Sequence, residues 1–328
     1  LDKAFEYLHK AGKRAAHLSA NEEAIVHYKK ALELLKKLPE TPDKVQKEIA
    51  LQLDFTVPVA ALKGYGAPEG LQAIFRARDL CHQIKESPQY FTVLVQLATH
   101  YAFVRAEYRT ALEYQDQINE IVEKTGDPLQ KAISFYTTVW SLFNIGELTQ
   151  TVEHAKEMNA LYDPEKHGFL AYMFGSDIGV VNRCFGAWAL WFLGYPDQAQ
   201  KEYDLAMWHA TKSGHPHTIA FALTGACEMD WFVGDKKAAK PHLEELTKIS
   251  NEKGFIYWQA HAVFYQGEKT ILDGKIEEGI AQMQQGLAMI KATGMQTCFT
   301  RLLARMAEAC LKTGQIEEGL KAIHEAGE

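Results

Sequence analysis

A tryptophan and three carboxylates recur at one fixed interval in the second half of the chain. Trp188, Glu228, Glu268 and Glu308 follow each other at intervals of 40 residues. Aromatic rings and carboxylates that share one surface favour a basic or an apolar ligand. We therefore expect these residue types to line a binding groove. The candidate ligand-binding residues are His100, Trp140, Trp188, Trp191, Glu228, Trp231, His261, Glu268, Arg301 and Glu308.

The same residues have a plainer interpretation. Aromatic side chains at helical spacing are most often part of a core, and charged side chains most often form a solvated face. A shared register can also be inherited when a repeat duplicates. In this alternative the tryptophans are core residues and the glutamates bind nothing.

The rest of the sequence offers no residue set for catalysis, a metal or a cofactor. The motifs His-Glu-x-x-His, paired Cys-x-x-Cys and Gly-x-Ser-x-Gly are absent. His215 and His217 flank a proline without an accompanying carboxylate pattern, so a metal site there is a weak alternative. The glycine-rich residues 64–70 follow an expected helix and lack a Lys-Ser or Lys-Thr, so we expect a turn there. We predict that this chain is not an enzyme.

Composition narrows the classes of partner. The 328 residues carry a formal charge of −7, which argues against a nucleic-acid ligand. The five cysteines are an odd number without a paired motif, which favours a reducing, cytoplasmic setting. No apolar run approaches the roughly 18–20 residues of a membrane span. We expect a protein or peptide partner, or a small ligand, and no membrane contact.

Turn residues indicate the elements that must position these side chains. Gly194, Gly234, Gly274 and Gly314 are 40 residues apart, and glycine permits the positive φ that ends a helix. Small residues recur five positions after and seven positions before these turns, as in Gly267 and Gly279. They would let two helices approach to about 8–10 Å. A fixed period of this size with helical filling predicts a stack of helix pairs.

The predicted fold is all-α: a right-handed α-solenoid of about eight helical hairpins with a period of about 40 residues. The first helix of each pair is expected to line the concave face. Their expected ranges are 2–17, 43–63, 88–105, 127–145, 176–193, 215–233, 255–273 and 295–313.

We expect one continuous superhelix over residues 1–328. Its repeats are expected at about 1–40, 41–86, 87–126, 127–175, 176–214, 215–254, 255–294 and 295–328. The fourth repeat contains an insert at about 162–176, where Pro164, Gly168 and Gly175 break the helices. The insert either contacts a ligand at the rim or only lengthens a connection.

The pattern of a turn glycine followed by a small residue, as in 194–199, resembles the tetratricopeptide repeat (TPR). The helices are longer than in the commonest form, which has about 34 residues per repeat. Four landmarks in order, at 63–69, 161–167, 186–196 and 277–280, resemble the C-terminal TPR region of bacterial multidomain cyclase–P-loop ATPase signalling proteins. This resemblance implies a regulatory arm whose partners include upstream domains of the same polypeptide. The chain starts at Leu1 without a Met, and we interpret it as a piece of a longer protein.

Two functions follow from these patterns. The first is a non-catalytic interaction and sensor module that binds a peptide, protein or small ligand in its concave groove. The alternative is a structural scaffold that forms oligomers without a soluble ligand, because uncovered solenoid ends leave apolar surface open.

Overall fold

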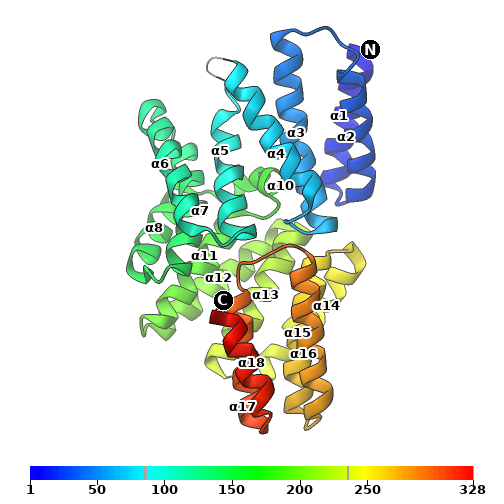
Figure 1. The fold of residues 1–328 in the computed structure, drawn as a ribbon. Coiled ribbons are helices and arrows are strands. Elements are labelled where there is room, and N and C mark those ends of the chain that lie inside the picture. Colours follow the sequence, from blue (N-terminus) through cyan, green and yellow to red (C-terminus); the bar gives the residue numbers. More distant parts are fainter. Residues whose placement is uncertain (85–86, 235, 328) are drawn as a thin grey trace.

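The computed structural model describes residues 1–84, 87–234 and 236–327, without the side chains of 236–239. These residues form helices and no strand. None of the described helices is both long and apolar enough to cross a bilayer. The helices pair into eight hairpins, which confirms the predicted α-solenoid (Figure 1).

The hairpins account for all of the longer helices. They are α1 (Asp2–His17) with α2 (Asn21–Leu35), α3 (Pro42–Lys63) with α4 (Pro68–Gln83), α5 (Tyr90–Thr99) and its π-helical extension η1 (His100–Val104) with α6 (Tyr108–Thr125), α7 (Pro128–Asn144) with α8 (Leu148–Leu161), α11 (Ile178–Phe192) with α12 (Pro196–Ser213), α13 (Pro216–Val233) with α14 (Lys236–Lys253), α15 (Ile256–Leu272) with α16 (Ile276–Ala292), and α17 (Phe299–Thr313) with α18 (Ile316–Gly327). The insert folds into the short helices α9 (Pro164–His167), η2 (Gly168–Leu170) and α10 (Ala171–Phe174).

Residues with positive φ close the hairpins at or beside the predicted turns. The φ angles of Gly146, Gly194, Gly234, Gly274 and Gly314 lie between 73° and 88°. In the second hairpin the left-handed residue is Gly64, with a φ of 87°, at the start of the turn expected within residues 64–70.

The helices of the seventh hairpin meet through glycine. A Cβ atom added to Gly267 of α15 would lie 2.6 Å from the backbone oxygen of Gly279 in α16, and a Cβ on Gly279 would lie 2.6 Å from the Gly267 oxygen. No side chain fits between the two backbones at this point. The expected role of the small residues beside the turns is therefore confirmed in this hairpin.

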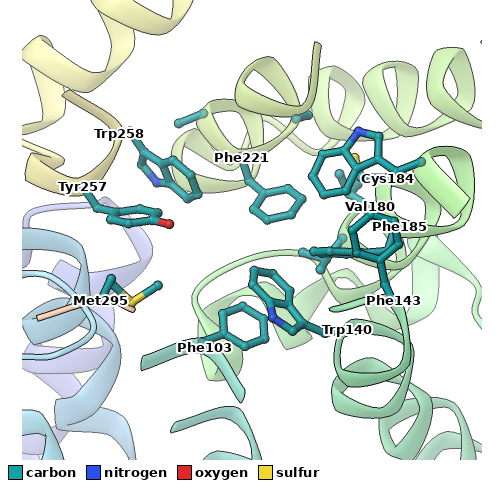
Figure 2. Packing of buried hydrophobic residues seen from close by; sticks show 14 of the residues in the cluster. Phe103, Trp140, Phe143, Val180, Cys184, Phe185, Phe221, Tyr257, Trp258 and Met295 are labelled. Atoms are coloured by element: carbon teal, nitrogen blue, oxygen red, sulfur yellow. The ribbon is translucent and has the colours of Figure 1, made fainter. Parts of the chain in front are cut away.

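Aromatic side chains of the first helices fill the interior of the middle hairpins. Trp140 of α7 stacks on Phe103 of η1, and its ring centre lies 4.4 Å from that of Phe185 in α11. Phe221 and Trp258 extend this cluster into α13 and α15 (Figure 2). Because the rings come from different hairpins, their burial holds consecutive hairpins together.

The second half of the chain folds back onto the second and third hairpins. The backbone N–H of Gln296 donates to the Val104 oxygen at 2.9 Å. A Cβ on Gly66 would lie 2.6 Å from the Thr293 oxygen. These two approaches, which we call the closure contact, connect the α16–α17 loop to the ends of α3 and η1. In Figure 1 this loop, in orange, passes beside the cyan helices.

His217 is a buried, hydrogen-bonded residue of this interior. Trp258 Nε1 donates to His217 Nε2 at 2.9 Å, and His217 Nδ1 lies 2.9 Å from Ser176 Oγ. Burial lowers the pKa of His217 to about 3, so the ring is neutral at pH 7. Both ring nitrogens are used, and the described residues contain no cluster suited to a metal ion.

We expect Gly267→Ala to destabilise the protein by about 1–3 kcal/mol, because the added methyl group meets backbone atoms that cannot move aside. The midpoint of urea unfolding would measure the loss. Gly225→Ala in α13 is the matched control, since its Cβ would lie 3.4 Å or more from every neighbour. Equal midpoints for the two variants would contradict the close approach of α15 and α16.

Candidate functional site

A groove of about 790 Å³ opens between the first helices of the last three hairpins. Helices α13, α15 and α17 form its walls, and α14 contributes Lys240 and Leu243. We call it the C-terminal groove. Three of the predicted residues, Trp231, Glu268 and Glu308, line it.

Two arginines of α17 neutralise the glutamates of the neighbouring helices. Arg305 donates from Nε to Glu268 Oε1 at 2.7 Å and from Nη2 to the second carboxylate oxygen. Arg305 Nη1 and Arg301 Nε each lie 3.2 Å from Glu228 Oε2. The Tyr265 hydroxyl donates to Glu228 Oε1 at 2.8 Å. These five residues, which we call the ionic cluster, join α13, α15 and α17.

The two carboxyl groups of the ionic cluster differ in acidity. Burial raises the pKa of Glu268 to about 7, against the opposing charge and hydrogen bonds of Arg305. Burial also acts to raise the pKa of Glu228, but the charges of Arg301 and Arg305 outweigh it and hold that pKa at about 2. Glu228 is therefore ionised at neutral pH, whereas Glu268 titrates there.

Tryptophan rings lie against both guanidinium groups. The Arg301 Cζ atom is 5.2 Å from the centre of the Trp188 ring, and the Arg305 Cζ atom is 4.5 Å from that of Trp231. A cation over an aromatic ring contributes about 0.5–2 kcal/mol, most where water is excluded. Trp188 is buried, whereas Trp231 is only half-buried and borders the groove. Trp231 is thus the ring of this pair that a ligand can reach.

The ionic cluster retains unused hydrogen-bonding capacity. Glu228 Oε2, Arg301 Nε and Arg305 Nη1 are buried atoms that meet one another in the 3.2 Å ion pairs but make no well-formed hydrogen bond in the described part of the chain. Trp188 Nε1 is buried there without a hydrogen-bonding partner. A buried polar atom left unpaired costs about 1–3 kcal/mol. A water molecule or a polar ligand group that reached these atoms would therefore be bound favourably.

The structure corrects the predicted groove at its N-terminal end. His100, Trp140, Trp188, Glu228 and His261 are buried, each with at most 6% of its surface exposed. The reason is that the aromatic first helices pack against each other across the interior. These tryptophans are core residues, as the plainer interpretation proposed. The plainer interpretation also placed the glutamates on a solvated face. Glu228 does not fit it, because its side chain is buried in the interior.

The remaining predicted residues keep some access to solvent. Trp191 is half-buried and stacks on Phe232. The Arg301 side chain is 22% exposed. Glu308 is 43% exposed and pairs with Lys312. The expected row of three free carboxylates is therefore wrong, because each glutamate of the row already has a cationic partner.

Arg305 and Tyr265 are the two residues of the ionic cluster that were not predicted from the sequence. Arg305 lies nine positions before Gly314, as Tyr265 lies nine positions before Gly274. It also follows Arg301 by one helical turn, on the same face. The register of the repeat could therefore have predicted where Arg305 lies on its helix. It could not have predicted which residues Arg305 pairs with.

Comparison with known proteins supports the fold. No protein-family model matches this chain, and no curated protein matches its sequence. A solved structure of a Rap protein complexed with competence and sporulation factor has a TM-score of 0.63 at 12% identity, over 99% of this chain and 97% of the other. A monomeric IFIT1 mutant with m7Gppp-AAAA has a TM-score of 0.37 at 13% identity, over 96% and 73%, which is too low to support an argument. The first likeness shows a TPR-like helical-repeat fold.

We expect Glu228→Gln to destabilise the protein by about 3–5 kcal/mol, because it removes one partner of a buried ion pair. The free energy of unfolding in urea at about pH 7.5 would measure it. Glu268→Gln is the matched variant, and we expect a smaller loss because the fold already favours its protonated form. A larger loss for Glu268→Gln would contradict the assigned acidities.

The pH dependence of the Glu268 variant tests the same electrostatics. The pKa of Glu268 in the folded protein, about 7, exceeds the ordinary value of a glutamate side chain, so the folded state holds the proton more tightly than the unfolded chain. Stability contributed by this proton is present in acid and is lost as pH rises through this window. The wild type should therefore lose stability relative to Glu268→Gln as the pH rises from about 5 to about 7. A difference that stays constant over this range would refute the raised pKa.

Proposed function

We propose that this chain is a non-catalytic, TPR-type interaction module that binds a protein segment or peptide in the C-terminal groove. We propose further that residues 1–328 form one continuous superhelix and act as the regulatory, cytoplasmic arm of a larger bacterial signalling protein. Upstream domains of the same polypeptide would then be partners. The order of the four sequence landmarks supports this context, and the fold of the Rap protein, solved with a bound factor, supports ligand binding.

The observation that carries the proposal is the position of the ionic cluster beside an open groove. Arg305 and Glu268 border the groove, and Arg305 Nη1 meets Glu228 Oε2 at 3.2 Å without forming a hydrogen bond. A peptide backbone or a polar side chain supplies both donors and acceptors and can satisfy such atoms. The half-buried ring of Trp231 offers an apolar contact for a neighbouring side chain.

The charges of the groove select a ligand of mixed character. Its lining includes four acidic residues, Asp230, Glu268, Asp273 and Glu308, and four basic residues, Lys240, Lys269, Arg305 and Lys312. A purely basic ligand would therefore meet as many like charges as opposite ones. We propose a segment that carries both signs of charge around an apolar side chain.

A second function, assembly of oligomers, is favoured by the last hairpin. Leu311 of α17 and Leu320 and Ile323 of α18 are large apolar residues, each more than half exposed. Exposed apolar residues at the end of a solenoid are a suitable surface for another copy or neighbour.

Selection from a random peptide library on the purified chain would test the first function. For the peptides recovered, we expect Trp231→Ala combined with Glu308→Lys to weaken binding at least tenfold, or about 1.4 kcal/mol, by calorimetry. Trp208→Ala is the control, because Trp208 is an exposed tryptophan of α12 outside the groove. Unchanged affinity in the double variant would exclude the groove.

Light scattering at several protein concentrations would test the second function. If the last hairpin mediates assembly, the wild type forms oligomers and Leu320→Glu with Ile323→Glu gives monomers. A wild type that is monomeric at every concentration would exclude the scaffold.

A further inference from the structure

A second cavity lies at the opposite end of the interior from the C-terminal groove. It has a volume of about 90 Å³ and is bordered by α1–α5, η1, α10 of the insert and the start of α13. We call it the N-terminal cavity. It contacts none of the residues of the ionic cluster, so its ligand would be independent of the proposed groove ligand.

The lining of this cavity carries no formal charge at neutral pH. No Asp, Glu, Lys or Arg borders it. Its ionisable bases are His100, His215 and His217, and burial lowers the pKa of each to about 4 or below. An ionised ligand would find no counter-charge in such a site, and burying an unpaired charge is costly. The cavity therefore suits an uncharged molecule.

Polar groups with no partner of their own face this space. Asn21 and His100 are 7% and 6% exposed, both border the cavity, and neither side chain has a hydrogen-bonding partner in the described ranges. Gln96 is 7% exposed and uses only its oxygen, which accepts from Thr56 at 3.4 Å. A neutral imidazole offers one donor and one acceptor, and an amide offers both as well. Together they can pair with a molecule that has a donor and an acceptor of its own.

The backbone at the cavity is irregular. His100 opens the π-helix η1, and Phe103 of the same turn borders the cavity with its ring. Short π-helical segments within α-helices occur frequently at functional sites. The irregular turn presents a hydrogen-bonding ring and an apolar ring to the same small volume.

The insert closes the cavity from the other side. Tyr172 and Met173 of α10 border it, and the Tyr172 ring stacks on His17 of α1 with ring centres 4.0 Å apart. The insert therefore connects the first hairpin to the fifth and sixth over this space. This placement favours the interpretation in which the insert contacts a ligand.

We propose that the N-terminal cavity binds a compact, uncharged azole or amide that hydrogen-bonds to Asn21 and His100 and lies against Phe103. The volume sets the size, because a cavity of about 150 Å³ holds benzene. A ligand for this space is therefore smaller than benzene.

Pyrazole is a suitable probe, since it is neutral at pH 7 and carries an adjacent N–H donor and nitrogen acceptor. We expect saturable binding to the wild type by NMR titration, with nuclear Overhauser effects between pyrazole protons and the methyl group of Met173. Thiophene, a ring of the same size without these groups, and acetate, a small anion, should bind at least five times more weakly.

Asn21→Leu and His100→Phe should each weaken pyrazole binding at least fivefold. His154→Phe is the matched control, because His154 also has an unpaired ring nitrogen but lies outside the cavity. Saturable binding that survives both site variants, or equal binding of thiophene, would overturn the proposal. So would the absence of an Overhauser effect at Met173 in the wild type, a result that does not depend on the variants being folded.

Discussion

The C-terminal half of the molecule depends on the need to neutralise two arginines inside the superhelix. Arg305 reaches Glu268 on α15 and Glu228 on α13, and Arg301 reaches the same Glu228. Charges with so little access to water must be paired. The pairing therefore fixes the first helices of three hairpins relative to each other, and it leaves the groove between them with a defined shape.

Side-chain volume divides the interior into two parts. Trp140 of α7, Phe185 of α11 and Phe221 in the first half of α13 bring large rings to the interior, and Trp140 and Trp188 are buried there. Nearer their C-terminal ends, α13, α15 and α17 carry Glu228, Glu268 and Arg305, and the groove lies beside these ion pairs. The open groove therefore follows the change from aromatic to charged residues along the repeats.

The local part of this structure could be predicted, and the long-range part could not. The 40-residue spacing from Gly194 to Gly314 predicted the hairpins, and the same interval led to Glu268 and Glu308, which line the groove. The burial of Trp140 and His100 depends on contacts with other hairpins, and the spacing of turn residues does not predict those contacts. The pairing of Arg305 likewise requires knowledge of how three helices converge. The periodicity of the sequence predicts the structure within one repeat. The burial of a side chain also depends on how all the repeats curve around the interior.

The closure contact limits how this architecture can change in evolution. An open solenoid tolerates the gain or loss of an internal repeat, because each unit contacts only its neighbours. Here the Gln296 N–H must reach Val104, and Thr293 must reach Gly66, across the intervening hairpins. One unit more or fewer between these positions would rotate the two partners away from each other. The number of hairpins from α5 to α16 is therefore fixed by geometry, and new units could be accommodated only outside that span.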